Sequence, residues 1–210
     1  MSLVRRFARP AGFLVALVLF LLLPNTAASC SAPGGEGTIE GSLTGTEMIT
    51  GSRPSLDADG ELTEFLKLEE NSTMATLLDQ ARADTPIRLA AAAVVVLLLL
   101  GVAVQLIRAR RVRAAATVVL AAGTSVLAVV LERLASVRWE PFLRETGLLT
   151  RDLPVNDGRD AVAAALDTQH PGLGFWLVLT TLAVIAIVNA ALLVSGSLGS
   201  RPTDAQQLGS

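Results

Sequence analysis

The sequence predicts an all-α integral membrane protein with four transmembrane helices, two cytoplasmic termini and two extracytoplasmic segments. Of its 210 residues, 51% are hydrophobic and only 17% are charged, whereas ordinary soluble domains carry about 25% charged residues. The apolar residues are gathered in four blocks at 11–29, 89–107, 114–131 and 173–194, each 18 to 22 residues long. About 20 apolar residues in a helix cross a hydrocarbon core, so each block is long enough to span a bilayer.

The charges between the blocks predict the orientation. Residues 1–10 carry +3 and the short loop 108–113 carries +4, while the segments 30–88 and 132–172 carry −7 and −2, and the tail 195–210 carries 0. Short loops rich in Lys and Arg remain in the cytoplasm. We therefore expect both termini and the short loop to be cytoplasmic and the two acidic segments to be extracytoplasmic. The topology-determining arginines are Arg5, Arg6, Arg9, Arg108, Arg110, Arg111 and Arg113.

The first block, 11–29, allows three interpretations. Arginines, an apolar run and small residues before Cys30 are typical of a transmembrane helix and also of a secretory signal. The helix is retained in the first interpretation. In the second, cleavage before Cys30 and acylation of its thiol would give a lipid-anchored protein. In the third, simple cleavage near Ala28 would leave three spans. We expect the retained helix.

The first acidic segment has two parts. Residues 29–55 are rich in Gly, Thr and Ser, and short stretches such as 38–40 and 46–50 predict brief strands or turns, or disorder. From 61 to 83, leucine and phenylalanine recur at helical intervals among acidic residues. This spacing predicts an amphipathic surface helix that leads through Pro86 into the second span, where a proline in the first turn is favourable.

The second acidic segment, 132–172, begins with Glu132 at the end of the third span. Trp139 and Trp176 lie near the ends of the third and fourth spans, where aromatic side chains anchor helices at the membrane interface. Residues 160–166 could form a short amphipathic helix before the fourth span.

Reactive side chains are scarce in this sequence. It holds one histidine and one cysteine, whereas metal sites use several His, Cys or carboxylate ligands in local spacing. Paired carboxylates in the acidic segments are typical of a solvated surface. We expect no catalytic residues, no cofactor and no metal. The net charge of −2 excludes a strongly basic nucleic-acid-binding protein.

Polar residues inside the spans are the remaining candidates for function, because a polar group in lipid needs a partner. Asn189 lies deepest in the fourth span, and Gln105 and Glu132 lie near the ends of theirs. We expect Asn189, Thr124 and Ser125 to hold the helices together through polar contacts, and a transport pathway is the alternative. None of the four blocks has an ionisable residue in its middle.

Several motifs resemble a group of uncharacterised actinobacterial four-span membrane proteins. They are Ser-Cys-Ser-Ala-Pro-Gly-Gly-Glu-Gly at 29–37, directly after the first block, the pairs Thr44-Gly45 and Thr50-Gly51, the arginine-rich loop, and the asparagine of the last block. The resemblance implies a shared topology with a retained first helix, and it implies no activity.

The function expected from the sequence is that of a non-enzymatic accessory or scaffold subunit of the plasma membrane. Its partners would be the lipid bilayer and another membrane protein or a second copy of this chain. A small transporter or channel subunit is the alternative, and acylation of Cys30 would instead make a lipid-anchored protein.

Overall fold

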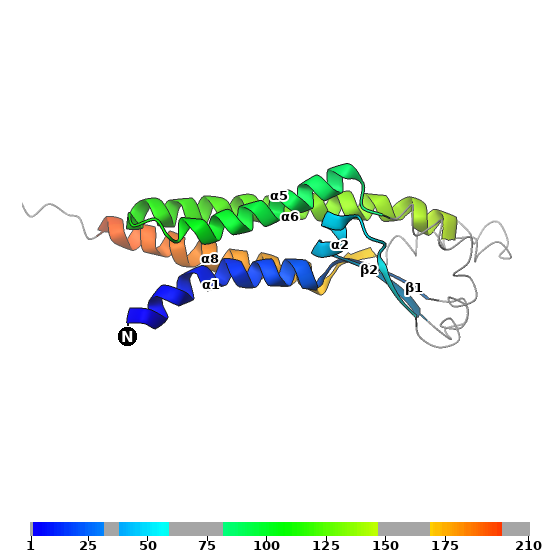
Figure 1. The fold of residues 1–210 in the computed structure, drawn as a ribbon, viewed down its shortest axis with the longest axis horizontal. Coiled ribbons are helices and arrows are strands. Elements are labelled where there is room, and N and C mark those ends of the chain that lie inside the picture. Colours follow the sequence, from blue (N-terminus) through cyan, green and yellow to red (C-terminus); the bar gives the residue numbers. More distant parts are fainter. Residues whose placement is uncertain (1, 32–37, 59–81, 147–168, 199–210) are drawn as a thin grey trace, which may run out of the picture.

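The computed structural model describes residues 2–31, 38–58, 82–146 and 169–198 as a helical bundle with a small sheet at one end (Figure 1). The long helices run antiparallel to their neighbours along the bundle, and the four strands gather where α1 ends and α8 begins. In chain order the elements are α1 (Ser2–Leu22), β1 (Pro24–Ser31), β2 (Thr38–Thr44), α2 (Gly45–Thr50), β3 (Ser55–Ala58), α5 (Thr85–Val104), α6 (Arg110–Thr146), β4 (Gln169–Pro171) and α8 (Leu173–Leu198).

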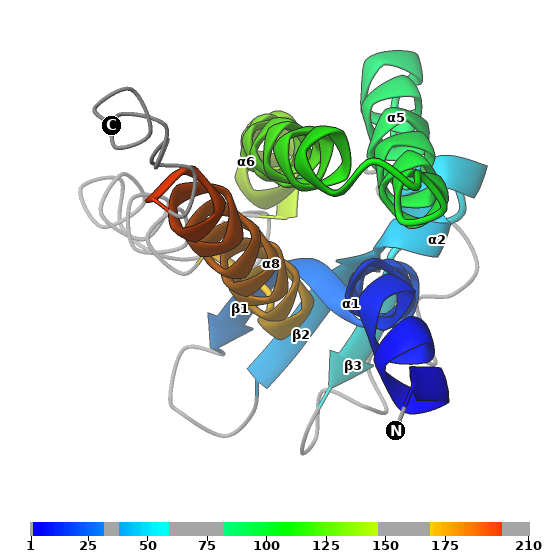
Figure 2. The same ribbon diagram turned by 90° about the vertical axis from the view of Figure 1, so that its left-hand side faces the viewer.

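The four long helices form a ring. Helix α1 packs on α5 and α8, and α6 packs on the same two helices from the opposite side, as the end-on view shows (Figure 2). The start of α1, the end of α8 and the loop between α5 and α6 lie together at one end of the bundle. We call this the arginine end, because residues 108–113 lie there, and we call the opposite end the sheet end.

Three of the described helices are long and apolar enough to cross a membrane. They comprise Thr85–Val104, Arg110–Val137 and Leu173–Ser195, which confirms the expectation of long apolar helices for the second, third and fourth blocks. The apolar part of α1 is the shorter stretch Ala11–Leu22. Large apolar side chains on the outside of the bundle are exposed, as a hydrocarbon solvent requires.

The prediction of one apolar helix over 11–29 is wrong at its C-terminal end, while its start agrees with the apolar stretch that begins at Ala11. Helix α1 begins at Ser2, so that Arg5, Arg6 and Arg9 lie within it, and it ends at Leu22. The next residues, Pro24–Ser31, form strand β1. The physical reason is Pro24, whose ring clashes with the helix and which lacks a backbone N–H. The small residues that follow it therefore extend the chain into a sheet.

A second difference concerns residues 46–50, which we expected to form a strand or turn. They lie in the short helix α2, which begins with a capping box: the Glu47 N–H donates to Thr44 Oγ1 over 3.3 Å, and the Thr44 N–H donates to Glu47 Oε2 over 2.7 Å. Such reciprocal bonds start a helix. It ends at Gly51, whose φ of 69° is left-handed and suits glycine.

Helix α6 is longer than the predicted span 114–131. It covers 37 residues and continues through Pro141 to Thr146; residues 131–140, directly after the predicted span, contain neither glycine nor proline. At about 1.5 Å per residue this helix is roughly 55 Å long. The first part of the segment 132–172 is therefore a direct continuation of the third span.

The sheet has the strand order β3-β2-β1-β4, and all of its pairs are antiparallel. Strand β1 is central, with Ala28 opposite Gly41 of β2 on one side and Ala27 opposite His170 of β4 on the other. The helices predicted over 61–83 and 160–166 fall mostly or wholly on residues outside the described ranges.

The interior of the bundle is filled by small and large apolar side chains. Phe13 and Ala16 of α1, Val94 and Leu98 of α5, and Leu182 of α8 are fully buried. Gly101 makes room for the ring of Phe13, since a Cβ at this position would collide with it. The helices therefore interlock around a dense core.

Candidate functional site

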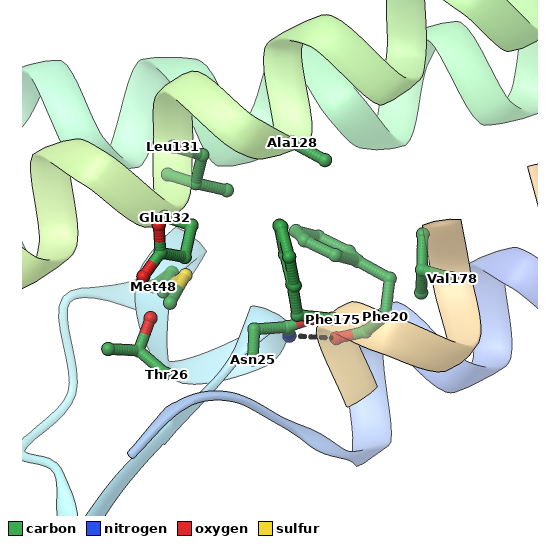
Figure 3. Close-up of a pocket in the computed structure, with 9 residues that line it drawn as sticks. All are labelled: Phe20, Asn25, Thr26, Met48, Ala128, Leu131, Glu132, Phe175 and Val178. Atoms are coloured by element: carbon green, nitrogen blue, oxygen red, sulfur yellow. Dashed lines mark hydrogen bonds between the residues drawn. The ribbon is translucent and has the colours of Figure 1, made fainter. Parts of the chain in front are cut away.

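A small cavity lies at the sheet end, where the bundle meets the sheet (Figure 3). Its volume of about 10 Å³ is close to what one water molecule needs. Helices α1, α2, α6 and α8 and strand β1 all contribute to its wall. The lining residues are Phe20, Asn25, Thr26, Met48, Ala128, Leu131, Glu132, Phe175 and Val178.

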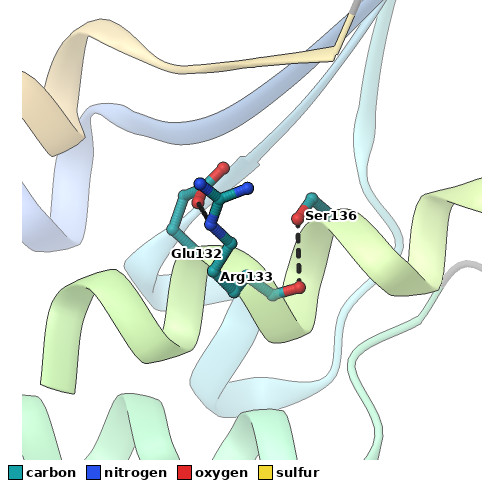
Figure 4. A network of polar contacts seen from close by, with 3 residues as sticks. All are labelled: Glu132, Arg133 and Ser136. Carbon is teal, nitrogen blue, oxygen red and sulfur yellow. Dashed lines mark hydrogen bonds and ion pairs between the residues drawn. The ribbon is translucent and has the colours of Figure 1, made fainter. Parts of the chain in front are cut away.

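Two polar side chains of this cavity come from different elements. Thr26 of β1 is 1% exposed, and its Oγ1 has no hydrogen-bond partner. The side chain of Glu132 on α6 is 11% exposed, and its Oε2 lies 3.9 Å from the Nε of Arg133, which is 81% exposed (Figure 4). So long and open an ion pair stabilises little. The cavity thus combines a carboxylate and an unpartnered hydroxyl with the Asn25 amide in a wall that is otherwise apolar.

Asn25 closes the end of helix α1. Its Nδ2 donates to the carbonyl oxygens of Phe20 (2.7 Å) and Leu23 (3.2 Å), and the Thr46 hydroxyl donates to the carbonyl oxygen of Leu21 (2.8 Å). The last carbonyls of a helix have no partner within the helix. Here strand β1 and helix α2 provide that partner, which fixes both of them to the bundle.

Glycines allow the turn between α1 and β1 and the turn between β4 and α8 to lie close together at the sheet end. The Gly172 N–H donates to the carbonyl oxygen of Asn25 over 2.9 Å, and a Cβ on Gly172 would collide with the carbonyl oxygen of Pro24. A Cβ on Gly45 would likewise collide with the carbonyl oxygen of Phe20. These contacts join the α1–β1 turn to the β4–α8 turn and to α2.

At the arginine end, the predicted polar residue Gln105 does link two helices. Its Nε2 donates to Thr117 Oγ1 of α6 over 3.0 Å, and the Thr117 hydroxyl donates to the carbonyl oxygen of Arg113 over 2.8 Å. The Nη1 of Arg113 donates to the carbonyl oxygen of Ile107 over 3.1 Å. Arg108, Arg110 and Arg111 are exposed.

The other predicted polar contacts are made inside single helices. Thr124 Oγ1 donates to the carbonyl oxygen of Leu120 (2.7 Å) and Ser125 Oγ to that of Ala121 (2.9 Å), and Asn189 Nδ2 donates to that of Ile185 (2.8 Å). These bonds satisfy the polar groups one turn back along the same helix. We expected these three side chains to hold the helices together, but the hydrogen bonds described above stay within one helix.

The predicted interface and lipidation residues lie at the sheet end. Trp176 is 56% exposed at the start of α8 and packs edge-on against Phe175, with ring centroids 5.5 Å apart. Trp139 lies on α6 and Cys30 on β1, and the side chains of both fall outside the described part of the chain. His170 is exposed on β4. Among the described residues, no group of three or more His, Cys, Asp or Glu residues could hold a metal ion.

Sequence reasoning missed Thr26, Met48 and Gly172. The signal for the helix end was visible, since Pro24-Asn25-Thr26 interrupts the first block and a proline inside a helical pattern ends or kinks the helix. Nothing local indicates that Met48, fully buried in α2, fills the space between strand β1 and helix α6.

The described elements define a class of protein: a helical membrane protein whose bundle carries a small antiparallel sheet at one end. Comparison of the chain with known protein families, with curated proteins and with solved structures gives no match.

Proposed function

We propose that this protein is a non-enzymatic accessory subunit of the plasma membrane that binds another membrane protein. The observation that carries the proposal is the filled interior of the bundle. Phe13, Ala16, Val94, Leu98 and Leu182 occupy its centre and are 0% exposed. A transport pathway needs polar or ionisable groups along a hydrated route, and this packed core favours a structural role.

The polar groups of the bundle support the same interpretation. The fully buried hydroxyls of Thr117 and Thr124 donate to carbonyl oxygens of their own helix. The ionisable residues of α6 lie near the two ends of its apolar stretch, with Arg113 on one side and Glu132 on the other. A proton or ion relay would place such groups near the middle of the bundle.

The proposed orientation puts the arginine end in the cytoplasm and the sheet end outside. Residues 108–113, expected as a loop, carry four arginines: Arg108 lies between α5 and α6, and the other three lie in the first turn of α6. Short arginine-rich connections between spans remain on the cytoplasmic side. The start of α1 and the end of α8 lie at the same end as this loop (Figure 1). An even number of spans would bring both termini to one side of the membrane, in keeping with a retained α1 as the fourth span.

Retention of α1 is supported by what its loss would remove. Cleavage near Ala28 or before Cys30 would separate most of β1, the central strand, from the rest of the chain. It would also remove Phe13 and Asn25, which lie buried in the bundle and at its sheet end. Intact-mass measurement of the membrane-extracted protein tests this: we expect the uncleaved chain with a free Cys30 thiol, and a diacylglycerol adduct or a truncated mass would contradict it.

The partner would bind the outside of the bundle within the membrane. Helix α8 has the least buried of the three long apolar stretches, with Val184, Ile187 and Val188 exposed along it. Helix–helix association in lipid depends on close packing of such faces. A second copy of the chain is the alternative occupant, and it would use the same face.

Site-specific photo-crosslinking in intact cells tests the proposal. A photoreactive residue is placed at Ile187 on α8, and matched controls are placed at Val119 on α6 and Val96 on α5, all of which are exposed. We expect a discrete adduct of a single protein from position 187 and lipid adducts from the controls. An adduct with a second copy of the chain would indicate that α8 mediates homo-oligomerisation, and it would contradict the accessory role. Lipid adducts alone at all three positions would contradict both.

The transporter alternative has its own test. Reconstituted in proteoliposomes, a transporter would carry ions or small solutes, and Glu132→Gln or Asn189→Ala would reduce that flux. We expect no protein-dependent flux from the wild-type chain, because the bundle centre is closed by apolar side chains. Flux that both substitutions abolish would overturn the accessory role.

A further inference from the structure

The loop at the arginine end has a fixed shape. Helix α5 ends in a tight turn, with the N–H groups of Leu106 and Ile107 donating to the carbonyl oxygens of Ala103 and Val104 over 3.0 Å each. The Arg113 side chain then returns to the carbonyl oxygen of Ile107 over 3.1 Å. Gln105 adds its 3.0 Å bond to Thr117. Arg108 in this turn and Arg110, Arg111 and Arg113 in the first turn of α6 are therefore presented from a backbone that these bonds hold in place.

Acidic residues are missing from the helices that surround this loop. The sequence has no Asp or Glu in α1, in α5, in α6 before Glu132, or in α8. Residues 108–113 carry four arginines and no acidic residue, which gives this short stretch a charge of +4. A concentrated positive charge of this kind attracts an anion from outside the protein.

Apolar side chains stand among the arginines. Leu106 is 84% exposed and Val112 is 58% exposed, next in sequence to the exposed residues Arg108, Arg110 and Arg111. Such side chains are favourable where acyl chains cover them. The neighbouring guanidinium groups would then lie at the level of the lipid headgroups, where long basic side chains extend toward water.

We propose that residues 105–113 form a binding site for the phosphate of an anionic phospholipid. Guanidinium groups bind phosphate oxygens in a forked, charge-assisted geometry, and basic clusters next to a membrane-spanning helix attract anionic lipids. Leu106 and Val112 favour a lipid over a soluble phosphate as the ligand of this site, since they would contact the acyl chain. The site needs membrane insertion alone and is independent of the partner proposed above.

Native mass spectrometry of the full chain in mild detergent tests the site. Phosphatidylglycerol and phosphatidylcholine with identical acyl chains are titrated in parallel. We expect preferential binding of phosphatidylglycerol, and a loss of about fivefold in its affinity for each arginine neutralised in Arg108→Gln/Arg110→Gln. The matched control is Arg88→Gln/Arg133→Gln, which neutralises two exposed arginines at the sheet end and should leave the preference unchanged.

Further variants separate charge from packing. Arg108→Lys/Arg110→Lys should keep most of the preference, because the charge remains, while Leu106→Ser should weaken both lipids alike. Circular dichroism of each variant checks that the helices are retained. Equal affinity for the two lipids would overturn the proposal, as would an equal loss in the sheet-end control. Competition by soluble glycerol phosphate at the same concentration would overturn the assignment to a lipid.

Discussion

The two ends of the bundle complete their helices in different ways. At the sheet end, the side chains of Asn25 and Thr46 bind the last carbonyl oxygens of α1, and the Gly172 N–H binds the chain just beyond. At the arginine end, the side chain of Gln105 reaches across to Thr117, and charged side chains are turned outward. At the sheet end, other elements of the fold supply the partners of the last α1 carbonyls. At the arginine end the bonds are local to the α5–α6 junction, and the exposed arginines face the surroundings.

This difference indicates at which end of the bundle the fold depends more on hydrogen bonds within the protein. A backbone carbonyl without a partner is costly wherever water is scarce, so that the bonds from Asn25 and Thr46 are most valuable next to the buried cavity. The arginine end needs fewer such bonds if water and lipid headgroups supply them. Substitutions at the sheet end should therefore destabilise the protein more than those at the arginine end.

The largest effect is expected from Gly172→Ala. The new Cβ would collide with the carbonyl oxygen of Pro24, and relief of the collision would strain the Gly172–Asn25 hydrogen bond. We expect a loss of about 3 kcal/mol in the free energy of unfolding, measured by denaturant unfolding in mild detergent. Gly123→Ala is the control: a Cβ there meets nothing within 4 Å, and alanine should stabilise the helix by up to about 1 kcal/mol. Equal effects of the two would refute the close-contact argument.

The next effect is expected from Asn25→Asp, which keeps the shape of the side chain and removes the amide donor. Two carbonyl oxygens at the end of α1 would lose their partner and face a carboxylate, at a cost of about 2 kcal/mol. Thr46→Val removes one bond at an exposed position and should cost about 1 kcal/mol or less. Thermal unfolding followed by circular dichroism compares the stability losses of the two variants. A larger loss from Thr46→Val would mean that Thr46, and not Asn25, is the main cap of helix α1.

A smaller effect is expected at the arginine end. A double-mutant cycle on Gln105→Leu and Thr117→Val measures the bond between Gln105, at the end of α5, and Thr117 of α6. Hydrogen bonds between helices in a membrane contribute about 0.6 kcal/mol on average, and we expect a coupling energy of that size. The cycle of Gln105→Leu with Ser125→Ala should be additive, because Ser125 bonds its own helix. Coupling above 2 kcal/mol would make this end as tightly held as the sheet end.

The smallest effect is expected from Thr26→Val. The hydroxyl of Thr26 is buried without a partner, so a methyl group of the same shape should change the unfolding free energy by less than about 0.5 kcal/mol, or increase it. Thr26→Ser keeps the hydroxyl and should lose roughly 1 kcal/mol with the missing methyl group. A loss above 1 kcal/mol in the valine variant would show that the hydroxyl bonds a water molecule or Glu132.

The sequence predicts the long helices better than their ends. Helix α8 begins at Leu173 as expected, because the turn His170-Pro171-Gly172 precedes a continuous apolar run. The prediction for the first block failed because the helix was continued past Pro24 on the strength of the small and apolar residues that follow. Hydropathy measures transfer into lipid, and it does not register that a proline and an asparagine end the helix between two apolar stretches.

The cavity at the sheet end was beyond prediction for a different reason. Glu132 was a candidate because a carboxylate at the end of a span is conspicuous in the sequence. Thr26 and Met48 were not candidates, since each is an ordinary residue that becomes important through packing of β1 and α2 against α6. Such long-range contacts have no local pattern, and they follow from the whole arrangement of the chain.

The central position of β1 in the sheet has a consequence for synthesis. Residues 26–28 of β1 pair with Gln169–Pro171, so one edge of the strand has to wait for about 140 further residues. At about 5–20 residues per second, that interval lasts roughly 7–30 s. An open strand edge pairs readily with other chains. The nascent protein is therefore most prone to aggregation just before its last helix enters the membrane, and a chain that ends before residue 169 would keep that edge open permanently.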